Sequence, residues 1–173
     1  MLRVREGDEA AFRELFKRHA AALVGFVDRF FYNRAVSEEV VQEVFLKVYR
    51  ARKKYQPKSK FTTWLYTIAT RASLNELRRG VFKQKRRELG EGDGATPAVD
   101  DEVAGRRLRD RVAKILAGLP ENQRAAFLLV RFGGRSYGEV AQILGLSESA
   151  VKSQIFRATD SVRRGLEEDG SGK

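Results

Sequence analysis

The stretch SYGEVAQILGLSESAVKSQIFRATDSVRR, residues 136–164, has the pattern of two short helices joined by a tight turn. Ser136 and Glu139, three residues apart, form a capping box, which predicts a helix start. Gly145 can adopt the left-handed conformation that ends such a helix, and Ser147 is the next candidate N-cap. Apolar residues recur at helical spacing in both segments: Val140, Ala141, Leu144, Val151, Ile155, Ala158 and Val162. The stretch is therefore predicted to be a helix-turn-helix.

The second of these helices has a polar face opposite its apolar stripe. Its members are Ser149, Lys152, Ser153, Phe156, Arg157 and Asp160. Phe156 is the informative residue, because contact with a thymine methyl in the major groove would use a ring that the helix pair's own core does not. Lys152 and Arg157 can reach guanine edges or phosphates, and the serines can bond to either. The face indicates DNA binding, although a helical hairpin with a solvated basic face has the same pattern.

Composition excludes several functional classes. The 173 residues include no Cys and a single His, so neither disulfides nor thiolate metal sites are expected, and no cofactor, metal site or catalytic residue is predicted. No apolar run approaches about 18 residues, and no secretory signal is visible, so we expect no membrane insertion and a cytoplasmic protein.

The net charge of +11 is unevenly distributed. Residues 1–87 hold 21 basic and 9 acidic residues, residues 88–105 hold 6 acids and no base, and residues 106–173 hold 13 bases and 8 acids. Residues 45–87 alone contain 14 Lys or Arg against one acid, Glu76. Such a concentration favours binding to phosphate backbones over a role in solubility alone.

The first half of the chain contains two amphipathic patterns. An apolar stripe over residues 7–31 predicts a helix, or two helices with a bend near Gly25. A second helix is predicted to start at Ser37 and to bury Val41, Val44, Phe45 and Val48. Leu46 lies on its other side among polar residues, a mixed face that also suits docking of a partner helix.

A basic loop, residues 53–60, precedes a third predicted helix over about residues 62–79. Its apolar side carries Trp64, Leu65, Ile68, Ala69 and Ala72, which we expect in the core. Its other side is predicted to present Thr63, Thr67, Thr70, Arg71 and Arg78 to solvent. Hydroxyls and guanidinium groups beside a basic loop are typical of a surface that binds a nucleic-acid strand.

Four further helices are predicted after the acidic, Gly-rich segment of residues 88–105, the last two being the helix-turn-helix. The predicted fold is all-α, with two small helical domains, residues 1–87 and 106–173, joined by a flexible linker.

Three segments, in this order, resemble the extracytoplasmic-function (ECF) group of bacterial sigma factors. EEVVQEVFLKVYRA (residues 38–51) is similar to the segment that binds the β′ clamp helices of RNA polymerase. FTTWLYTIATRASLNELRR (residues 61–79) is similar to the segment that handles the −10 promoter element. Residues 116–164 resemble region four, which reads the −35 element. The resemblance implies an alternative sigma factor that binds core RNA polymerase, through its β′ and β subunits, and promoter DNA, and that an anti-sigma factor inhibits.

The resemblance also implies site residues. The −35 contacts fall on Ser149, Lys152, Ser153, Phe156 and Arg157, and the core-polymerase contacts on Val40, Gln42, Glu43, Phe45 and Leu46. The −10 contacts fall on Lys58, Lys60, Thr63, Thr67, Arg71, Asn75, Arg78 and Arg79. Related factors often have Asn where this chain has Arg71. Thr67 and Ile68 occupy the positions of the paired Trp residues of primary sigma factors, so promoter melting is expected to depend on base capture.

Two other classes remain open from the sequence. A conventional activator or repressor would use residues 136–164 without contacting polymerase. A nucleic-acid enzyme has little support, because the chain lacks a Walker-type loop and clustered carboxylates.

Overall fold

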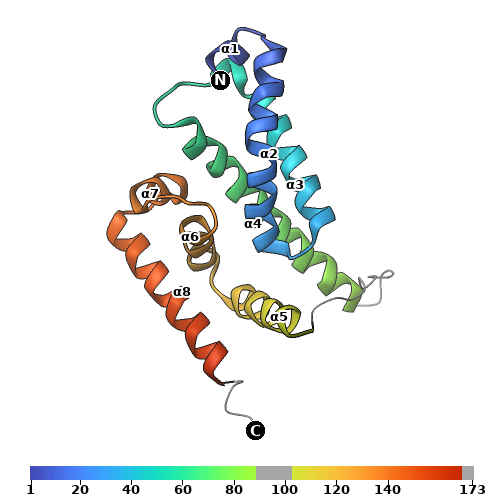
Figure 1. Cartoon of the computed structure of the whole chain (residues 1–173), viewed down its shortest axis with the longest axis vertical. Coiled ribbons are helices and arrows are strands. Elements are labelled where there is room, and N and C mark those ends of the chain that lie inside the picture. The colour runs from blue at the N-terminus through green and yellow to red at the C-terminus, as the bar shows by residue number, and fades with distance from the viewer. Residues whose placement is uncertain (89–102, 169–173) are drawn as a thin grey trace.

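The computed structural model describes residues 1–88 and 103–168, and every regular element in these ranges is helical (Figure 1). The prediction of an all-α fold is confirmed. The elements are α1 (Leu2–Arg5), α2 (Glu9–Phe31), α3 (Arg34–Arg50), the 3₁₀ turn η1 (Arg52–Lys54), α4 (Phe61–Glu88), α5 (Val103–Gly118), α6 (Glu121–Arg131), α7 (Tyr137–Leu144) and α8 (Glu148–Glu168).

Helices α7 and α8 form the predicted helix-turn-helix. The Ser136 hydroxyl accepts from the Glu139 backbone N–H, and the Glu139 carboxylate accepts from the Ser136 N–H, which completes the capping box. Gly145 ends α7 at φ 67°, the left-handed conformation that glycine adopts without a steric penalty. Ser147 then caps α8 by accepting from the Ala150 N–H at 3.2 Å. Local sequence therefore determines both the turn and the entry into α8.

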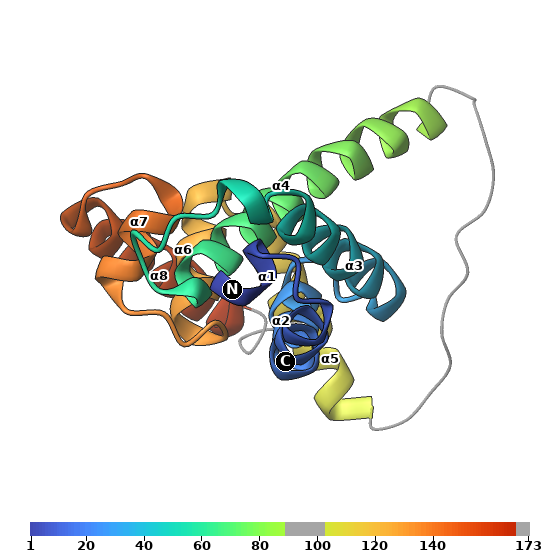
Figure 2. The same ribbon diagram turned by 90° about the horizontal axis from the view of Figure 1, so that it is seen from above.

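Helices α2, α3 and α4 form the core of the N-terminal half. Their fully buried residues include Phe26, Phe30, Val44 and Leu65. Two predicted boundaries were wrong. Helix α3 begins three residues before Ser37, because Asn33 caps it and Ser37 bonds back to the Asn33 carbonyl inside the helix. Helix α4 continues to Glu88 and extends beyond the rest of the fold (Figure 2).

Helix α4 is central, since it packs against α2, α3 and α7. Because it has neighbours on three sides, the expected division into an apolar buried face and a hydroxyl-bearing exposed face was wrong. Thr63 and Thr70 are 3% and 1% exposed, whereas Trp64 and Ile68 are only half-buried.

The C-terminal helices pack directly on the N-terminal ones: α5 and α6 contact α2, and α7 contacts α4. In Figure 1, α6 and α7 lie beside α4 although they are far from it in sequence. Helix α4 ends at Glu88 and α5 begins at Val103, and the predicted flexible linker of residues 88–105 falls mostly on residues 89–102, which lie outside the described ranges.

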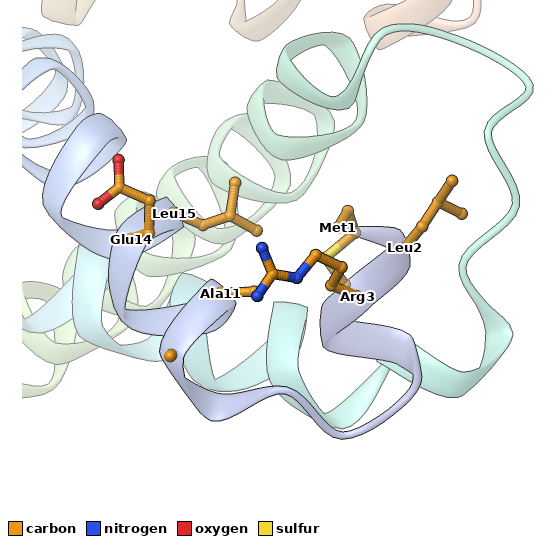
Figure 3. A pocket seen from close by; sticks show the side chains of 7 residues that line it. Met1, Leu2, Arg3, Ala11, Glu14 and Leu15 are labelled. Atoms are coloured by element: carbon orange, nitrogen blue, oxygen red, sulfur yellow. The ribbon is translucent and has the colours of Figure 1, made fainter.

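The short helix α1 folds against α2 and leaves a hollow of about 510 Å³ between them. Figure 3 shows Arg3 extending its guanidinium toward Ala11 and Leu15 at this hollow. No helix within the described residues is long and apolar enough to cross a membrane.

Candidate nucleic-acid and polymerase interfaces

The predicted −35 reader is an exposed face of α8. Phe156 is 74% exposed, while its neighbour Ile155 is 6% exposed and packs in the core. The other four members of the predicted set are exposed as well: Ser149, Lys152, Ser153 and Arg157. The five side chains are therefore available to a partner, and the prediction that this partner is DNA is consistent with their chemistry.

Asp160 is the one acid on this face, and adjacent cations offset its charge. Its carboxylate accepts from Arg163 at 3.0 Å and lies 2.5 Å from Arg164. The hydrogen bond from Arg163 lowers the pKa of Asp160. The acid is therefore screened by two arginines, which limits its repulsion of a phosphate backbone.

A pocket of about 400 Å³ lies between α3 and α4, in the segment predicted to handle the −10 element. Its lining is Lys47, Ala51, Trp64, Ile68, Arg71, Ala72 and Asn75. An indole ring offers a flat surface for stacking, an amide can bond to base edges, and two cations can neutralise phosphates. These are the groups that a site for an unstacked base requires.

Most of the predicted −10 residues lie on accessible surface. Lys58, Lys60, Arg71, Asn75, Arg78 and Arg79 are exposed. Thr67 is partly buried, and its hydroxyl donates to the Thr63 carbonyl at 2.8 Å. The prediction that Thr63 faces solvent is wrong, because α4 turns it inward at 3% exposure.

The pocket includes residues that the sequence interpretation assigned elsewhere. Trp64 and Ile68 were expected in the core, and Lys47 was not assigned to any site. The sequence contains a signal for the pocket wall on α4, because positions 64, 68, 71 and 75 recur at helical spacing and therefore share one face of that helix. Reading that face as a mixed apolar and polar groove would have found the pocket.

The predicted polymerase surface is only partly exposed. Leu46 is 55% exposed, Gln42 is exposed, and Glu43 pairs with Lys47 at 2.8 Å. Val40 and Phe45, however, are 4% and 3% exposed and belong to the core, so the expectation that they contact a partner directly needs correction. The Phe45 ring instead packs against Phe16 of α2, with 4.8 Å between the ring centroids, and Phe16 is 41% exposed.

Comparison with known families matches both halves of the chain. Residues 15–81 match Sigma-70 region 2, and residues 109–159 match Sigma-70 region 4. The chain is 35% identical to the RNA polymerase sigma factor CarQ of Myxococcus xanthus over 97% of this chain and 96% of that protein. It is 33% identical to the ECF RNA polymerase sigma-E factor of Escherichia coli strain K12 over 92% and 88% of the two chains.

Solved structures agree with this relationship. CnrH, determined in complex with the cytosolic domain of CnrY, superposes with a TM-score of 0.74 at 27% identity, over 96% of this chain and 94% of CnrH. The sigma factor RpoE of Bartonella quintana, determined with the anti-sigma factor NepR, shares the fold with a TM-score of 0.70 at 23% identity. The match covers 91% of this chain and 97% of RpoE. The chain therefore belongs to the ECF group of the sigma-70 family, whose members direct promoter-specific initiation of transcription by RNA polymerase.

Proposed function

We propose that this sigma factor divides promoter recognition between α8 and the α3–α4 pocket. Helix α8 reads the −35 element in duplex DNA, with Phe156 in apolar contact and Lys152 and Arg157 bonding to base edges or phosphates. The observation that carries this assignment is the 74% exposure of Phe156 on a helix whose opposite side is fully packed. An exposed ring between two cations has no structural function within its own module.

The −10 element is bound as the strands separate. A base released from the stack enters the pocket beside Trp64, where the Asn75 amide meets its edge and Lys47 and Arg71 neutralise adjacent phosphates. Unstacking costs a few kcal/mol per base, which contacts in the pocket must offset. Arg71 extends further than the Asn common in related factors, so the pocket is expected to accept a different base or flanking phosphate geometry.

Core polymerase is bound by the exposed part of α3 and the adjoining part of α2. Leu46 and Gln42 supply direct contacts, and Phe16 offers further exposed apolar surface on α2. Val40 and Phe45 act from the core by fixing the position of α3. We assign residues 1–87 to polymerase and −10 binding and residues 106–173 to −35 binding, and no bond chemistry is required of the chain.

Reconstituted transcription tests this assignment. The purified chain, added to core polymerase and fragmented genomic DNA from the source organism, should yield transcripts with defined start sites. Core enzyme without the chain should yield no transcripts that start at these sites. If it does start transcription at the same sites, the proposal is refuted. A conventional DNA-binding regulator would fail to start transcription with core enzyme alone.

An anti-sigma factor is proposed as a further partner, because the sigma factor RpoE was solved with the anti-sigma factor NepR. The cytoplasm, where polymerase acts, is the proposed location. Affinity purification of the chain from its native cells should recover polymerase subunits together with such an inhibitor. Recovery of polymerase without any inhibitor, under non-inducing conditions, would argue against anti-sigma control.

A further inference from the structure

A second hollow of about 510 Å³ lies where the end of α2, the middle of α4 and the α5–α6 turn meet. All three segments contribute to its apolar lining, which consists of Phe30, Phe31, Leu74, Leu77 and Leu119. Phe30 is buried, whereas the other four side chains are only half-buried and leave apolar surface uncovered. A hollow of this size with a mostly apolar lining is typical of sites that hold small molecules. It shares no residue with the α3–α4 pocket.

The polar part of the lining contains one ion pair and one further cation. Arg78 of α4 donates to Glu121 of α6 twice, at 2.8 Å from Nε and 2.5 Å from Nη2. Both side chains are roughly half exposed, at 56% and 46%, so the pair lies at the solvent side of the hollow. The hydrogen bonding with Arg78 lowers the pKa of Glu121, so the carboxylate is ionised at neutral pH and matches the charge of Arg78. The further cation is Arg124.

Arg124 is buried with no carboxylate beside it. It is 7% exposed, and its Nη2 donates to the Phe30 carbonyl at the end of α2. Within the described residues, Nε and Nη1 make no hydrogen bond, and no acid pairs with the guanidinium. A backbone carbonyl carries only part of a charge, whereas buried charges in proteins are normally paired with a full counter-charge. The lining therefore has one positive charge that the described residues do not balance.

Helical spacing brings these groups together. Glu121 and Arg124 are three residues apart in the first turns of α6, and Leu74, Leu77 and Arg78 follow the same spacing on α4. Capping the Phe30 carbonyl uses one nitrogen of Arg124 and leaves its charge at the wall of an apolar hollow. An apolar residue at this position would avoid the cost of removing a guanidinium from water. An anion that enters the hollow would balance the charge.

We propose that this hollow binds a small amphipathic carboxylate, of the class of medium-chain fatty acids. The carboxylate accepts from Arg124, and the apolar chain covers Leu74, Leu77 and Leu119. A nucleotide or another polyanion fits less well, because the lining offers a single unmatched charge and no polar side chain besides the three charged ones. The inference does not depend on the promoter assignment, since Arg124 and the three leucines lie outside the proposed DNA and polymerase sites.

Methyl NMR of the full chain tests the site, with octanoate, decanoate and 1-octanol as probes. Octanoate should shift the methyl signals of Leu74, Leu77 and Leu119 saturably and leave those of Leu46 and Leu108, which are exposed, unchanged. Uncharged 1-octanol should bind about tenfold or more weakly, because hydrogen bonds to charged groups are the stronger ones. Decanoate should bind about fourfold more tightly for each added CH₂. Equal affinity for octanoate and 1-octanol would overturn the proposal, and so would equal shifts at Leu46 and Leu108.

Two variants locate the binding. Ala117→Phe fills the hollow from an exposed position of its lining, and Ala22→Phe makes the same change at an exposed position of α2 outside it. The first should lose octanoate binding and the second should keep it. Arg124→Gln retains a donor for the Phe30 carbonyl without the charge, so its affinity for octanoate should fall to that for 1-octanol.

Circular dichroism checks the helicity of each variant. Unchanged octanoate affinity in a folded Arg124→Gln chain would overturn the role of Arg124. If that variant loses helicity, the two Phe variants decide, together with the octanoate and 1-octanol affinities of the native chain. Octanoate binding to Ala117→Phe as tight as to Ala22→Phe would show that the hollow is not the site.

Discussion

Replacing Phe156 with Ala should weaken promoter binding while leaving the fold intact. The ring is 74% exposed, so about a quarter of it is removed from water. Full burial of a Phe side chain stabilises by about 1.5–3 kcal/mol, so this fraction contributes roughly 0.5 kcal/mol. The higher helix propensity of Ala restores a similar amount. At about 2–4 °C per kcal/mol for a chain of this size, the melting temperature should move by less than about 2 °C.

Ile155 provides the matched control, because it adjoins Phe156 on the same helix but is 6% exposed. Ile155→Ala removes core packing and should cost about 2–5 kcal/mol, which lowers the melting temperature by roughly 4–20 °C. The two variants therefore predict opposite patterns. Phe156→Ala should lose DNA affinity while its melting temperature is nearly unchanged, whereas Ile155→Ala should show a large fall in melting temperature.

Binding is measured with reconstituted holoenzyme on a promoter fragment recovered by the transcription assay. Loss of one apolar base contact should cost about 1–3 kcal/mol, or about 5- to 150-fold in affinity. The salt dependence should not change in Phe156→Ala, since no charge is removed, whereas Lys152→Ala should reduce the slope by about 0.9 if it contacts a phosphate. A melting temperature that falls in Phe156→Ala as far as in Ile155→Ala would refute the reasoning, and so would unchanged promoter affinity.

Three other predictions follow from the sites and the pKa shifts. Leu46→Glu should abolish association with core polymerase without changing the melting temperature, because Leu46 is exposed. The control variant Val44→Ala should lower the melting temperature, because Val44 is fully buried. Reversing Arg78 and Arg79 to Glu should reduce permanganate reactivity of the promoter bubble while −35 duplex binding persists; normal bubble reactivity would contradict the −10 assignment. Burial lowers the pKa of His19, so the unfolded chain takes up the proton first and stability should fall as pH drops below about 6.5. Thermal melts at pH 7.5 and 5.5 should show a larger difference for the native chain than for His19→Gln, and equal differences would exclude His19 as the cause.

The sequence predicted the elements that depend on local signals. The capping box at Ser136, the left-handed Gly145 and the cap at Ser147 act within one helical turn, so the helix-turn-helix and its outward Phe156 could be derived without tertiary information. The exposure of Leu46 followed in the same way from its place among polar residues. In each case the residue lies on a helix face that stays exposed, 74% for Phe156 and 55% for Leu46, and periodicity is then sufficient.

Helix α4 could not be predicted as well, because residues on both its expected apolar side and its expected polar side are buried: Leu65, Ala69, Thr63 and Thr70. Amphipathic periodicity assumes one buried face and one exposed face. Here Thr70 is 1% exposed although it lies on the expected polar side, and Trp64 lines a pocket whose other wall is α3. The burial of Thr70 is not encoded in the order of residues along α4, since it depends on long-range packing, whereas the helical spacing of positions 64, 68, 71 and 75 does indicate the pocket face. Periodicity correctly predicted that Phe45 is buried, and only the family resemblance placed Val40 and Phe45 among the polymerase contacts. A family motif identifies positions that matter for binding, but it does not separate residues that contact the partner from residues that support the contact.

The same packing makes α4 the element that connects the N-terminal core, the α3–α4 pocket and the C-terminal helices. Leu65 and Ala69 anchor it in the N-terminal core, Trp64 forms the pocket wall, and Arg78 contacts α6. A small displacement of α4 relative to α3 changes the width of the pocket, because α3 supplies its opposite wall. Helix α3 also carries the exposed Leu46, so the proposed polymerase surface and the pocket wall lie on the same helix. Substitutions in α4 therefore need separate measurements of polymerase binding, strand binding and interdomain distance, since one residue change can alter all three by different routes.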